Sequence, residues 1–600
     1  MRLHHNFYQA IAENAQNYPE KIALHSNEKN ITYYQLHQNV MRLSKRLKAA
    51  DIKKGDVVAV YMPNSIELLI SIYAVLSLRA VVLPVDISIP QERVNIIFAH
   101  SRPALVLYNK DTPETAEYNS LKSMAVDLLS LEADGDAADC DLIDISEEDG
   151  AFCIYTSGTT GIPKGVFLKY KGILNHASAK ADLLNLTQGS RLCLSFSIGF
   201  VASIWQIIVP VLMGAELFIY DGNLIKKPYQ FFKQVEKDKI KVVSMTPHTL
   251  QSYLEYIKIK NRRLLLPDIT HIILTGEKIS GALAKEFYSN YKSITLVNAY
   301  GQTECSDDTY HYMIPGSFNQ AHVPIGKPID GIAGFVLKED FTECETGELF
   351  IGGLGVADGY ISDRELTERK FVKLPFFSTP LFRTGDIVKR IDEAGNLAYL
   401  GRVDNQVKIR GYRVELEEIE TYLNQFDGIK QAVAGTLEKD GDIILQAFYT
   451  SDTHLDQKEI RDYLAAKLPA YMVPAIFKRV QSFMLTGNRK IDRKRVSECI
   501  EIKTDLIRPD KNDSEALNGF QSRALEALKS VLDVNTFGEL TLENVLEDIG
   551  MDSINFVASV SALESEFNFE WEDGMLVMTE FTTVKSMIDY AESRFGANHS

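Results

Sequence analysis

Short apolar segments alternate with helical patterns from the N-terminus to about Gly401, and this alternation constrains the fold more than any other feature. The segments VVAVYMP, AVVLPVD, KVVSMTP and HIILTGE predict buried strands, whereas SIELLISIYAVLSL and KEFYSNY predict helices. Such alternation is typical of α/β regions with parallel sheets. We therefore predict a large α/β subdomain over residues 1–401, with ligands at the carboxyl ends of its strands.

The pattern changes after residue 401. ELEEIETYLNQF and DQKEIRDYLAAKL predict helices, and KQAVAGTL, DIILQAFYT and AIFKRV predict strands, so residues 402–500 should form a small α+β subdomain. Residues 501–519 have the polar composition of a linker. Residues 520–596 should form an all-α domain, with helices near 520–532, 553–567 and 583–594. A chain of 600 residues is long enough for several such units.

Charge and cysteine content exclude several classes of function. The net charge is −17, and the segment from Lys511 to Ser600 holds 17 acidic and 5 basic residues, which argues against a nucleic-acid partner. The six cysteines form no CxxC pair, so we expect no structural zinc. The first residues lack the apolar core of a signal peptide, and the longest apolar run, Leu68–Leu78, is too short to span a bilayer. We therefore expect a cytoplasmic protein with no membrane partner.

The stretch IYTSGTTGIPKGVFL, residues 154–168, predicts a loop that holds phosphate. Its hydroxyl groups and the backbone N–H groups that glycine leaves accessible are donors, and Lys164 adds a positive charge. A Walker P-loop is excluded, because Pro163 precedes the lysine and Gly165 follows it, where the motif requires glycine and Ser or Thr. The alternative is an ordinary surface loop.

Five further motifs follow in order: NAYGQTE (298–304), GELFIGG (347–353), RTGD (383–386), GRVDNQVKIRGYRVELEEIE (401–420) and NRKIDR (488–493). Together with YTSGTTGIPKGV they resemble the adenylate-forming superfamily, which includes acyl-CoA synthetases, luciferases and the adenylation domains of nonribosomal peptide synthetases. The resemblance covers about residues 5–500. It implies that a carboxylate attacks the α-phosphate of ATP, giving an acyl-adenylate and pyrophosphate, and that a thiol then displaces AMP to give a thioester.

The resemblance also assigns roles to individual residues. Glu304 would bind the Mg²⁺ that accompanies ATP, and Asp386 would accept hydrogen bonds from the ribose hydroxyls, near Arg402. Tyr300 would stack on adenine, and Lys490 would contact both the carboxylate and the α-phosphate. The implied catalytic residues are Lys490, Thr156 and Glu304. The implied nucleotide-binding residues are Ser157, Gly158, Thr159, Thr160, Gly161, Lys164, Gly276, Asn298, Tyr300, Thr303, Asp386 and Arg402.

In this superfamily the small subdomain alternates between two positions, one for each half-reaction. Asp404 matches the hinge, and KIRGYR matches the loop that moves in for thioester formation. Gln302 departs from the pattern, because peptide-synthetase members usually have proline there.

The segment EDIGMDSINFV, residues 547–557, resembles the phosphopantetheine attachment site of carrier domains, which are acidic four-helix bundles. Ser553 would begin a helix, and a plain N-cap is the alternative. The resemblance implies a 4′-phosphopantetheine on Ser553, attached by a phosphopantetheinyl transferase. Its tethered thiol would have an effective concentration of about a millimolar. Since no motif follows the carrier, we expect a loading module that passes its cargo to a separate condensation or ketosynthase protein.

The substrate pocket departs from the pattern for α-amino acids. Peptide-synthetase adenylation domains usually read Phe-Asp-x-Ser-x-Trp where this chain has Phe200, Val201, Ala202, Ser203, Ile204 and Trp205, and the aspartate pairs with the α-ammonium. Valine in its place would cost an α-amino acid ~3–5 kcal/mol. Aligned by motif, the remaining pocket positions are Ser244, Ile273, Thr275, Ala299, Asp307 and Asp308. We therefore expect a small acid without an α-ammonium: an aryl, hydroxy, keto or β-amino acid.

Two alternatives remain open. One is a module for an α-amino acid, with Asp307 or Asp308 as the counter-charge. The acidic pair could instead contact a distant amine or a hydroxyl, or lie outside the pocket. The other alternative is a non-catalytic protein that binds adenylates or docks carriers, and the presence of Lys164, Glu304, Asp386 and Lys490 argues against it.

Overall fold

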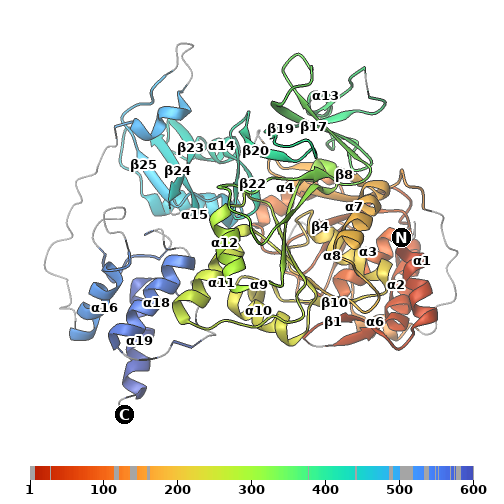
Figure 1. Cartoon of the computed structure of the whole chain (residues 1–600), viewed down its shortest axis with the longest axis horizontal. Helices are drawn as coiled ribbons and strands as arrows, with labels where there is room; N and C mark the ends of the chain where they lie inside the picture. The colour runs from red at the N-terminus through yellow and green to blue at the C-terminus, as the bar shows by residue number, and fades with distance from the viewer. Residues whose placement is uncertain are drawn as a thin grey trace.

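The computed structural model describes residues 7–598 apart from short gaps. These gaps comprise 28, 114–119, 135–144, 159–161, 376, 440–441, 486–490, 501–517, 533–539, 547–548, 550, 552, 568, 570, 573–574, 576–580 and 582. The predicted linker 501–519 therefore lies almost entirely outside the described residues. Figure 1 shows the large subdomain beside two smaller units, with the C-terminus far from the N-terminus.

Two of the sheets in the large subdomain have parallel strands at their centres. The first has the order β15 (Lys327–Pro328), β14 (Asp307–Ile314), β13 (Thr295–Gln302), β12 (His271–Thr275), β11 (Val242–Met245), β9 (Arg191–Leu194), β10 (Glu216–Ile219), β1 (Ile22–His25), β2 (Asn30–Thr32). The second has the order β6 (Ser123–Ala125), β5 (Leu105–Tyr108), β3 (Val57–Tyr61), β4 (Val81–Val85), β7 (Gly150–Thr156), β8 (Lys164–Lys169). In the first sheet, β2 pairs antiparallel with β1 at one edge, and β14 and β15 are antiparallel to their neighbours at the other. In the second sheet, β7 and β8 are antiparallel.

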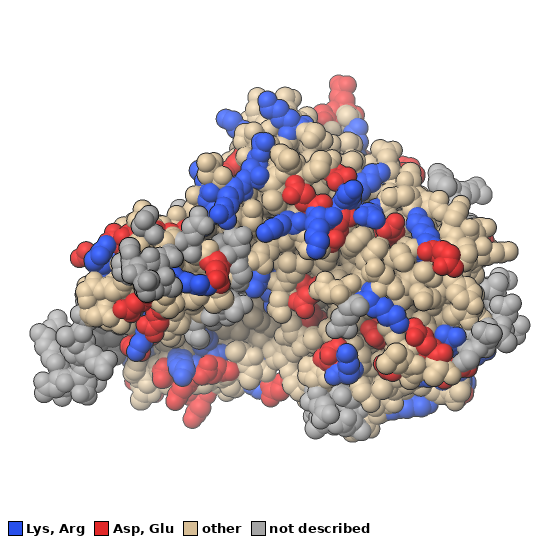
Figure 2. Space-filling model, turned by 90° about the horizontal axis from the view of Figure 1, so that it is seen from below, with Lys and Arg blue, Asp and Glu red and all other residues tan. Residues whose placement is uncertain are grey.

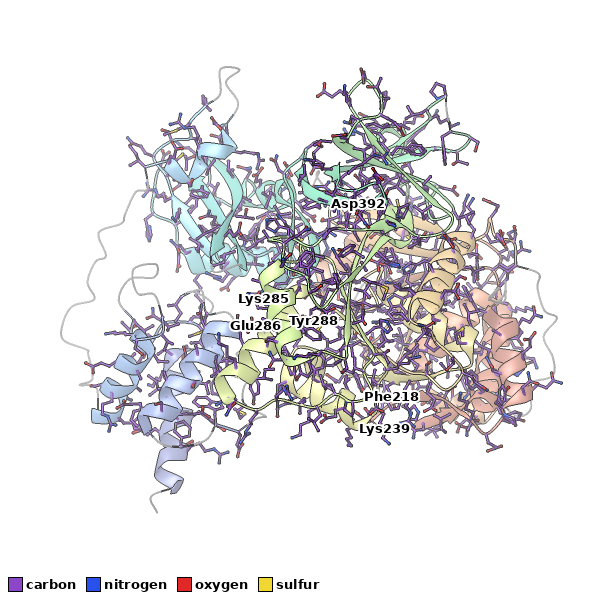
Figure 3. All side chains as sticks on the ribbon, viewed as in Figure 1. Phe218, Lys239, Lys285, Glu286, Tyr288 and Asp392 are labelled. Atoms are coloured by element: carbon purple, nitrogen blue, oxygen red, sulfur yellow. The ribbon has the colours of Figure 1, made fainter. Side chains whose placement is uncertain are left out.

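Helices cover these sheets, as the alternating pattern predicted. They are α1 (Phe7–Asn17), α2 (Tyr33–Ala49), α3 (Ile66–Ser77), α4 (Gln91–Ser101), α6 (Leu128–Glu132), α7 (Tyr170–Leu183), α8 (Ser203–Met213), α9 (Gly222–Ile225), α10 (Pro228–Lys237), α11 (Pro247–Lys260) and α12 (Gly281–Asn290). Helix α3 is apolar on nearly every side and almost wholly buried, and the Ser65 hydroxyl caps it by accepting from the Leu68 N–H. On α12, Tyr288 points into the core whereas Lys285 is exposed (Figure 3).

A third sheet was not predicted. It joins β16 (Ile332–Leu337), β17 (Thr346–Gly353), β19 (Leu381–Arg390), β18 (Phe371–Val372) and β20 (Leu397–Arg402), with α13 (Arg364–Lys370) beside it. Every pairing in it is antiparallel. The prediction of parallel sheets therefore holds for the centres of the first two sheets, and the region as a whole is mixed.

The small subdomain follows the predicted α+β order. A hairpin of β21 (Gln406–Ile409) and β22 (Tyr412–Glu415) precedes α14 (Leu416–Leu423). A sheet of β23 (Gln431–Lys439), β24 (Asp442–Thr450) and β25 (Ile476–Arg479) then packs with α15 (Gln457–Ala465). The β21–β22 hairpin faces the large subdomain, and its contacts are described below.

The C-terminal segment is helical, as predicted, with α16 (Gly519–Lys529), α18 (Ser553–Phe567) and α19 (Val584–Asn598) in its described part. Its own apolar core includes Leu528, Val560, Leu563 and Ile588. We call residues 519–598 the carrier segment, after the attachment motif predicted in it. This segment lies beside α11 (Figure 1).

Charges of both signs are interspersed on the face of the molecule seen in Figure 2. Among the described residues, no helix has the length and apolar character needed to cross a membrane.

Candidate active site

The predicted phosphate loop connects two paired strands. Thr156 ends β7 opposite Lys164, which begins β8, so the antiparallel pair holds both ends of the loop. The Thr156 hydroxyl is buried and has no hydrogen-bond partner among the described residues, which exclude 159–161 of this loop. Thr159, Thr160 and Gly161 lie outside the described residues. The loop therefore leaves the carboxyl end of a buried strand, the position at which α/β sheets bind ligands.

The small subdomain contacts this loop directly. The Ser157 hydroxyl donates to the carbonyl oxygen of Arg413 at 2.9 Å, and the Gly158 N–H donates to Glu418 Oε2 at 3.0 Å. Glu418 Oε1 accepts from Arg93 Nη1 of the large subdomain at 2.6 Å. A carboxylate of the small subdomain thus occupies a backbone donor that the resemblance assigns to phosphate.

Glu304, the predicted Mg²⁺ ligand, is fully buried, and its carboxylate accepts hydrogen bonds from a guanidinium and from a hydroxyl group. Arg413 Nη1 lies 2.8 Å from Oε1 and 3.0 Å from Oε2, and the Tyr360 hydroxyl donates to Oε1 at 2.6 Å. Burial alone would raise the pKa of Glu304, but the Arg413 charge and the Tyr360 hydrogen bond lower it to about 2. The carboxylate is therefore ionised, as a metal ligand must be.

Lys164 faces an acidic residue of the β21–β22 hairpin, Glu415. Its Nζ lies 3.7 Å from Glu415 Oε1, and both side chains are largely buried. Burial lowers the pKa of Lys164, and the Glu415 charge opposes the shift only in part. Arg413, Glu415 and Glu418 therefore engage three groups that the resemblance assigns to the metal and the phosphates.

Asp386, predicted to bind the ribose, accepts three hydrogen bonds from neighbouring side chains. The Tyr300 hydroxyl and Gln302 Nε2 donate to Oδ2 at 2.5 and 2.7 Å, and Arg402 Nη1 donates to Oδ1 at 2.6 Å. Arg402 Nε also donates to Oδ1 of the predicted hinge residue, Asp404, at 2.6 Å. Gln302 was noticed in the sequence only as a departure from proline, and its contact with Asp386 was missed.

Of the other predicted nucleotide residues, Gly276 and Thr303 directly follow strands, and Asn298 lies within β13. Gly276 follows β12 with a φ of +89°, and a Cβ added there would lie 3.0 Å from the Cα of Gly411 in the hairpin turn. Asn298 donates from Nδ2 to the Pro324 carbonyl oxygen at 2.7 Å, and Thr303 begins a short 3₁₀ turn. Lys490 lies outside the described residues, so its predicted catalytic position stays a prediction.

The predicted pocket residues share one face of the first sheet. Ser244 is in register with Ile273, and Thr275 with Ala299, across adjacent parallel strands. All four are buried. The remaining members come from the segment that leads into α8: Val201, Ala202 and Trp205 are buried, and Phe200 is half-buried against Tyr412 of the hairpin.

Asp307 and Asp308 belong to a larger set that we call the polar cluster: His176, Lys180, Asp307, Asp308 and His311. His176 and Lys180 lie one turn apart on α7, and His311 is in register with Ala299. The sequence analysis missed these three residues. The spacing of four between His176 and Lys180 was visible, but only the fold places α7 against β14.

Ser553 is the first residue of α18, as the motif predicted. Helix α18 packs on α11 of the large subdomain, where Lys260 forms an ion pair with Glu564. Val557 of α18 packs against the apolar core of the large subdomain to which α11 contributes. The carrier segment is therefore docked on the large subdomain.

Comparisons with known proteins cover nearly the whole chain. A family model described as AMP-binding enzyme matches residues 11–361, and one described as phosphopantetheine attachment site matches residues 522–591. Tyrocidine synthase 1 of Brevibacillus parabrevis is 30% identical over 98% of this chain, which spans 53% of that protein. The chain thus spans about half the length of this curated relative.

Two solved structures resemble the chain. An artificially fused adenylation–PCP di-domain of a nonribosomal peptide synthetase, NpsA-ThdA from Klebsiella oxytoca, has a TM-score of 0.71 at 25% identity, covering 80% of this chain and 94% of that one. Holo-PA1221, which contains adenylation and PCP domains, has a TM-score of 0.80 at 21% identity, covering 98% and 97%. The second likeness shows that the fold extends through the carrier.

Proposed function

Because the chain belongs to the AMP-binding enzyme family, we propose that it activates a carboxylic acid with ATP and transfers the acyl group to phosphopantetheine on its own Ser553. The observation that carries the proposal is the contact between α18, which begins at Ser553, and α11 of the region that holds the nucleotide residues. A chain with both parts in contact needs no thiol from solution.

The residues present fit Mg²⁺ and ATP. The buried, ionised Glu304 already faces a positive charge, that of Arg413, so a cation suits this position. When bound, Mg²⁺ would neutralise phosphate charge. Lys164 and the N–H of Gly158 would hold the phosphates, and Asp386 would orient the ribose. Phosphopantetheine would supply the thiol, and the chain would present it from the start of α18.

The small subdomain has to move for these groups to meet ATP, because Arg413, Glu415 and Glu418 engage them in this arrangement. We assign the arrangement to the thioester half-reaction, in which KIRGYR lies against the large subdomain. Asp404, which accepts a hydrogen bond from Arg402 at the boundary, would serve as the hinge. In the other position, Lys490 would contact the carboxylate and the α-phosphate.

The acid that we propose has no α-ammonium group. Val201 is buried where an α-amino acid would need a carboxylate, and an unpaired buried ammonium costs ~3–5 kcal/mol. Lys180 Nζ already lies 2.7 Å from Asp308 Oδ2, which weakens the case for Asp308 as a substitute counter-charge. The chain would act as a loading module, with a phosphopantetheinyl transferase and a downstream condensation or ketosynthase protein as partners.

A second candidate keeps the same chemistry with an α-amino acid. It is favoured by the likeness to NpsA-ThdA, a di-domain of a nonribosomal peptide synthetase, and by Asp307, whose buried Oδ2 has no hydrogen-bond partner among the described residues. The structure of AlmE from Vibrio cholerae, a further neighbour, holds glycyl-adenosine-5′-phosphate.

Two measurements test the proposal. ATP–pyrophosphate exchange with a panel of acids should show activity with an acid lacking an α-ammonium. Intact-mass analysis of the phosphopantetheinylated chain should then show the mass of that acyl group, and Ser553→Ala should abolish the gain while exchange persists. Acylation of free coenzyme A but never of the chain would overturn the carrier role, and preference for an α-amino acid would overturn the substrate class.

A further inference from the structure

The polar cluster lies on the pocket face of the first sheet. Thr275, Ala299 and His311 are in register across β12, β13 and β14, so their side chains project from the same face. Helix α7 covers this face and contributes His176 and Lys180. The Lys180 ammonium also lies 5.6 Å from the centre of the Trp205 ring, another predicted pocket residue. The cluster therefore adjoins the pocket that was inferred from the motifs.

One half of the cluster is satisfied within the protein. Asp308 Oδ2 accepts from Lys180 at 2.7 Å, and Oδ1 accepts from the Thr275 hydroxyl at 3.0 Å. Lys180 is fully buried, and the two opposite charges balance each other. A substrate group gains little at Asp308, because it would have to displace a buried lysine.

The other half has polar atoms without partners. His176 Nε2 and Asp307 Oδ2 lie 3.5 Å apart, and within the described part of the chain neither atom has a hydrogen-bond partner, although each side chain is only 5% exposed. Three more buried atoms have no hydrogen-bond partner among the residues that the structure describes: His311 Nε2, Trp205 Nε1 and Ser244 Oγ. Buried polar atoms in proteins almost always have a partner. A group of them beside a substrate pocket therefore indicates a polar ligand.

The charges at these atoms indicate which ligand fits. Burial, followed by the neighbouring Asp308 charge, raises the pKa of Asp307 well above its usual value, which favours the neutral form of this carboxyl group. Burial lowers the pKa of His176 and of His311, so both rings are neutral as well. The neutral Asp307 carboxyl can donate its O–H, and His176 Nε2 accepts in the tautomer that carries its proton on Nδ1. A hydroxyl matches both at once, whereas an ammonium only donates and would require Asp307 to lose its proton beside the ionised Asp308.

We propose that Asp307 and His176 together bind a hydroxyl group that the acid carries away from its carboxylate, and that Lys180 keeps Asp308 paired beside them. The substrate class is thereby a hydroxy-substituted carboxylic acid without an α-ammonium. This inference rests on the proposed function, since it names the acid that the adenylation reaction consumes.

A metal ion is the competing occupant. Ligand atoms of His176, Asp308 and His311 lie within 4.8 Å of one another. However, the Lys180 ammonium already occupies Asp308 Oδ2, and a cation placed there would meet its charge. This argues for an uncharged group, and metal content can be measured directly.

The experiment uses the full-length chain and compares acids in matched sets of three. ATP–pyrophosphate exchange is measured with the hydroxy, amino and unsubstituted forms of benzoate and butyrate skeletons, and with the standard α-amino acids. The hydroxy form should exceed the unsubstituted form by about 10²-fold or more in kcat/KM, because a site built for a hydroxyl rejects the analogue that lacks it.

Variants then connect this preference to the two residues. Asp307→Leu and His176→Leu should each reduce the hydroxy-to-unsubstituted ratio by at least about 10-fold while the KM for ATP stays constant. Asp307→Asn, which keeps a donor and an acceptor, should retain part of the ratio. His271→Gln, at the opposite end of β12 from Thr275, should leave the ratio unchanged.

Three results would overturn the inference. The first is a higher kcat/KM for the amino form of an acid than for its hydroxy form, and the second is an equal kcat/KM for all three forms. The third is a stoichiometric metal bound to the chain that is lost in the His176 variant. Each can occur while the chain still loads Ser553. If no acid supports exchange or loading, the proposed function itself fails, and the two failures are thus distinguishable.

Discussion

A single guanidinium of the small subdomain, that of Arg413, binds both carboxylate oxygens of Glu304 in the large subdomain, at 2.8 and 3.0 Å. The two residues are 109 positions apart. The same carboxylate is the proposed Mg²⁺ ligand, so one negative site would serve a protein cation in one arrangement and a metal cation in the other. Binding of Mg²⁺ and the present arrangement should therefore exclude each other.

Arg413→Gln should impair carrier loading more than adenylation. The change leaves the buried Glu304 unpaired in the present arrangement, at a cost of ~3–5 kcal/mol, so loading of Ser553 should fall about 10²-fold or more. Single-turnover loading and ATP–pyrophosphate exchange measure the two steps separately. Arg495→Gln, at an exposed arginine of the small subdomain outside KIRGYR, should change neither step. An equal loss of exchange and loading in Arg413→Gln would contradict this assignment.

The alternation of apolar strands and helices was sufficient to predict the large α/β subdomain, because its central strands are buried on both faces. The polar cluster could not be predicted in the same way. His311 reaches the pocket face because it is paired with Ala299 of β13, in a register that a bulge after Tyr300 sets. Strand register and bulges depend on tertiary packing. Contacts such as that of Arg413 with Glu304 depend on where a separate subdomain docks, which no local pattern specifies.

Reversing the charge of Lys260 should slow loading of the carrier. Lys260 of α11 pairs with Glu564 of α18, and both side chains are mostly buried. In Lys260→Glu the like charges should weaken this docking and reduce the loading rate about 10-fold, an effect of 1–2 kcal/mol. Glu564 also accepts a hydrogen bond from the backbone N–H of Trp571, which a change of Glu564 would remove. The substitution is therefore made at Lys260.

Lys258→Glu provides the matched control for this experiment, because Lys258 is exposed on the same helix. Time-resolved intact-mass analysis gives the loading rate, and exchange should be normal in both variants. Identical loading in the two variants would show that the α11–α18 contact plays no part in transfer.

Gly411→Ala should block the hairpin from its place on the large subdomain. Gly411 has a φ of +85°, and an added Cβ would lie 2.4 Å from Cγ2 of Thr246, a β-branched side chain with little freedom to turn away. Gly395 has a φ of +86° with nothing within 4 Å of an added Cβ, so Gly395→Ala carries the same backbone cost of about 1–2 kcal/mol without the clash. Loading should therefore fall about 10²-fold in Gly411→Ala, where overpacking adds ~1–3 kcal/mol, and much less in Gly395→Ala. Exchange should persist in both, because in the proposed cycle adenylation takes place in the arrangement in which the hairpin has left Thr246. Equal loading by the two variants would mean that the contact of Gly411 with Thr246 does not form during transfer.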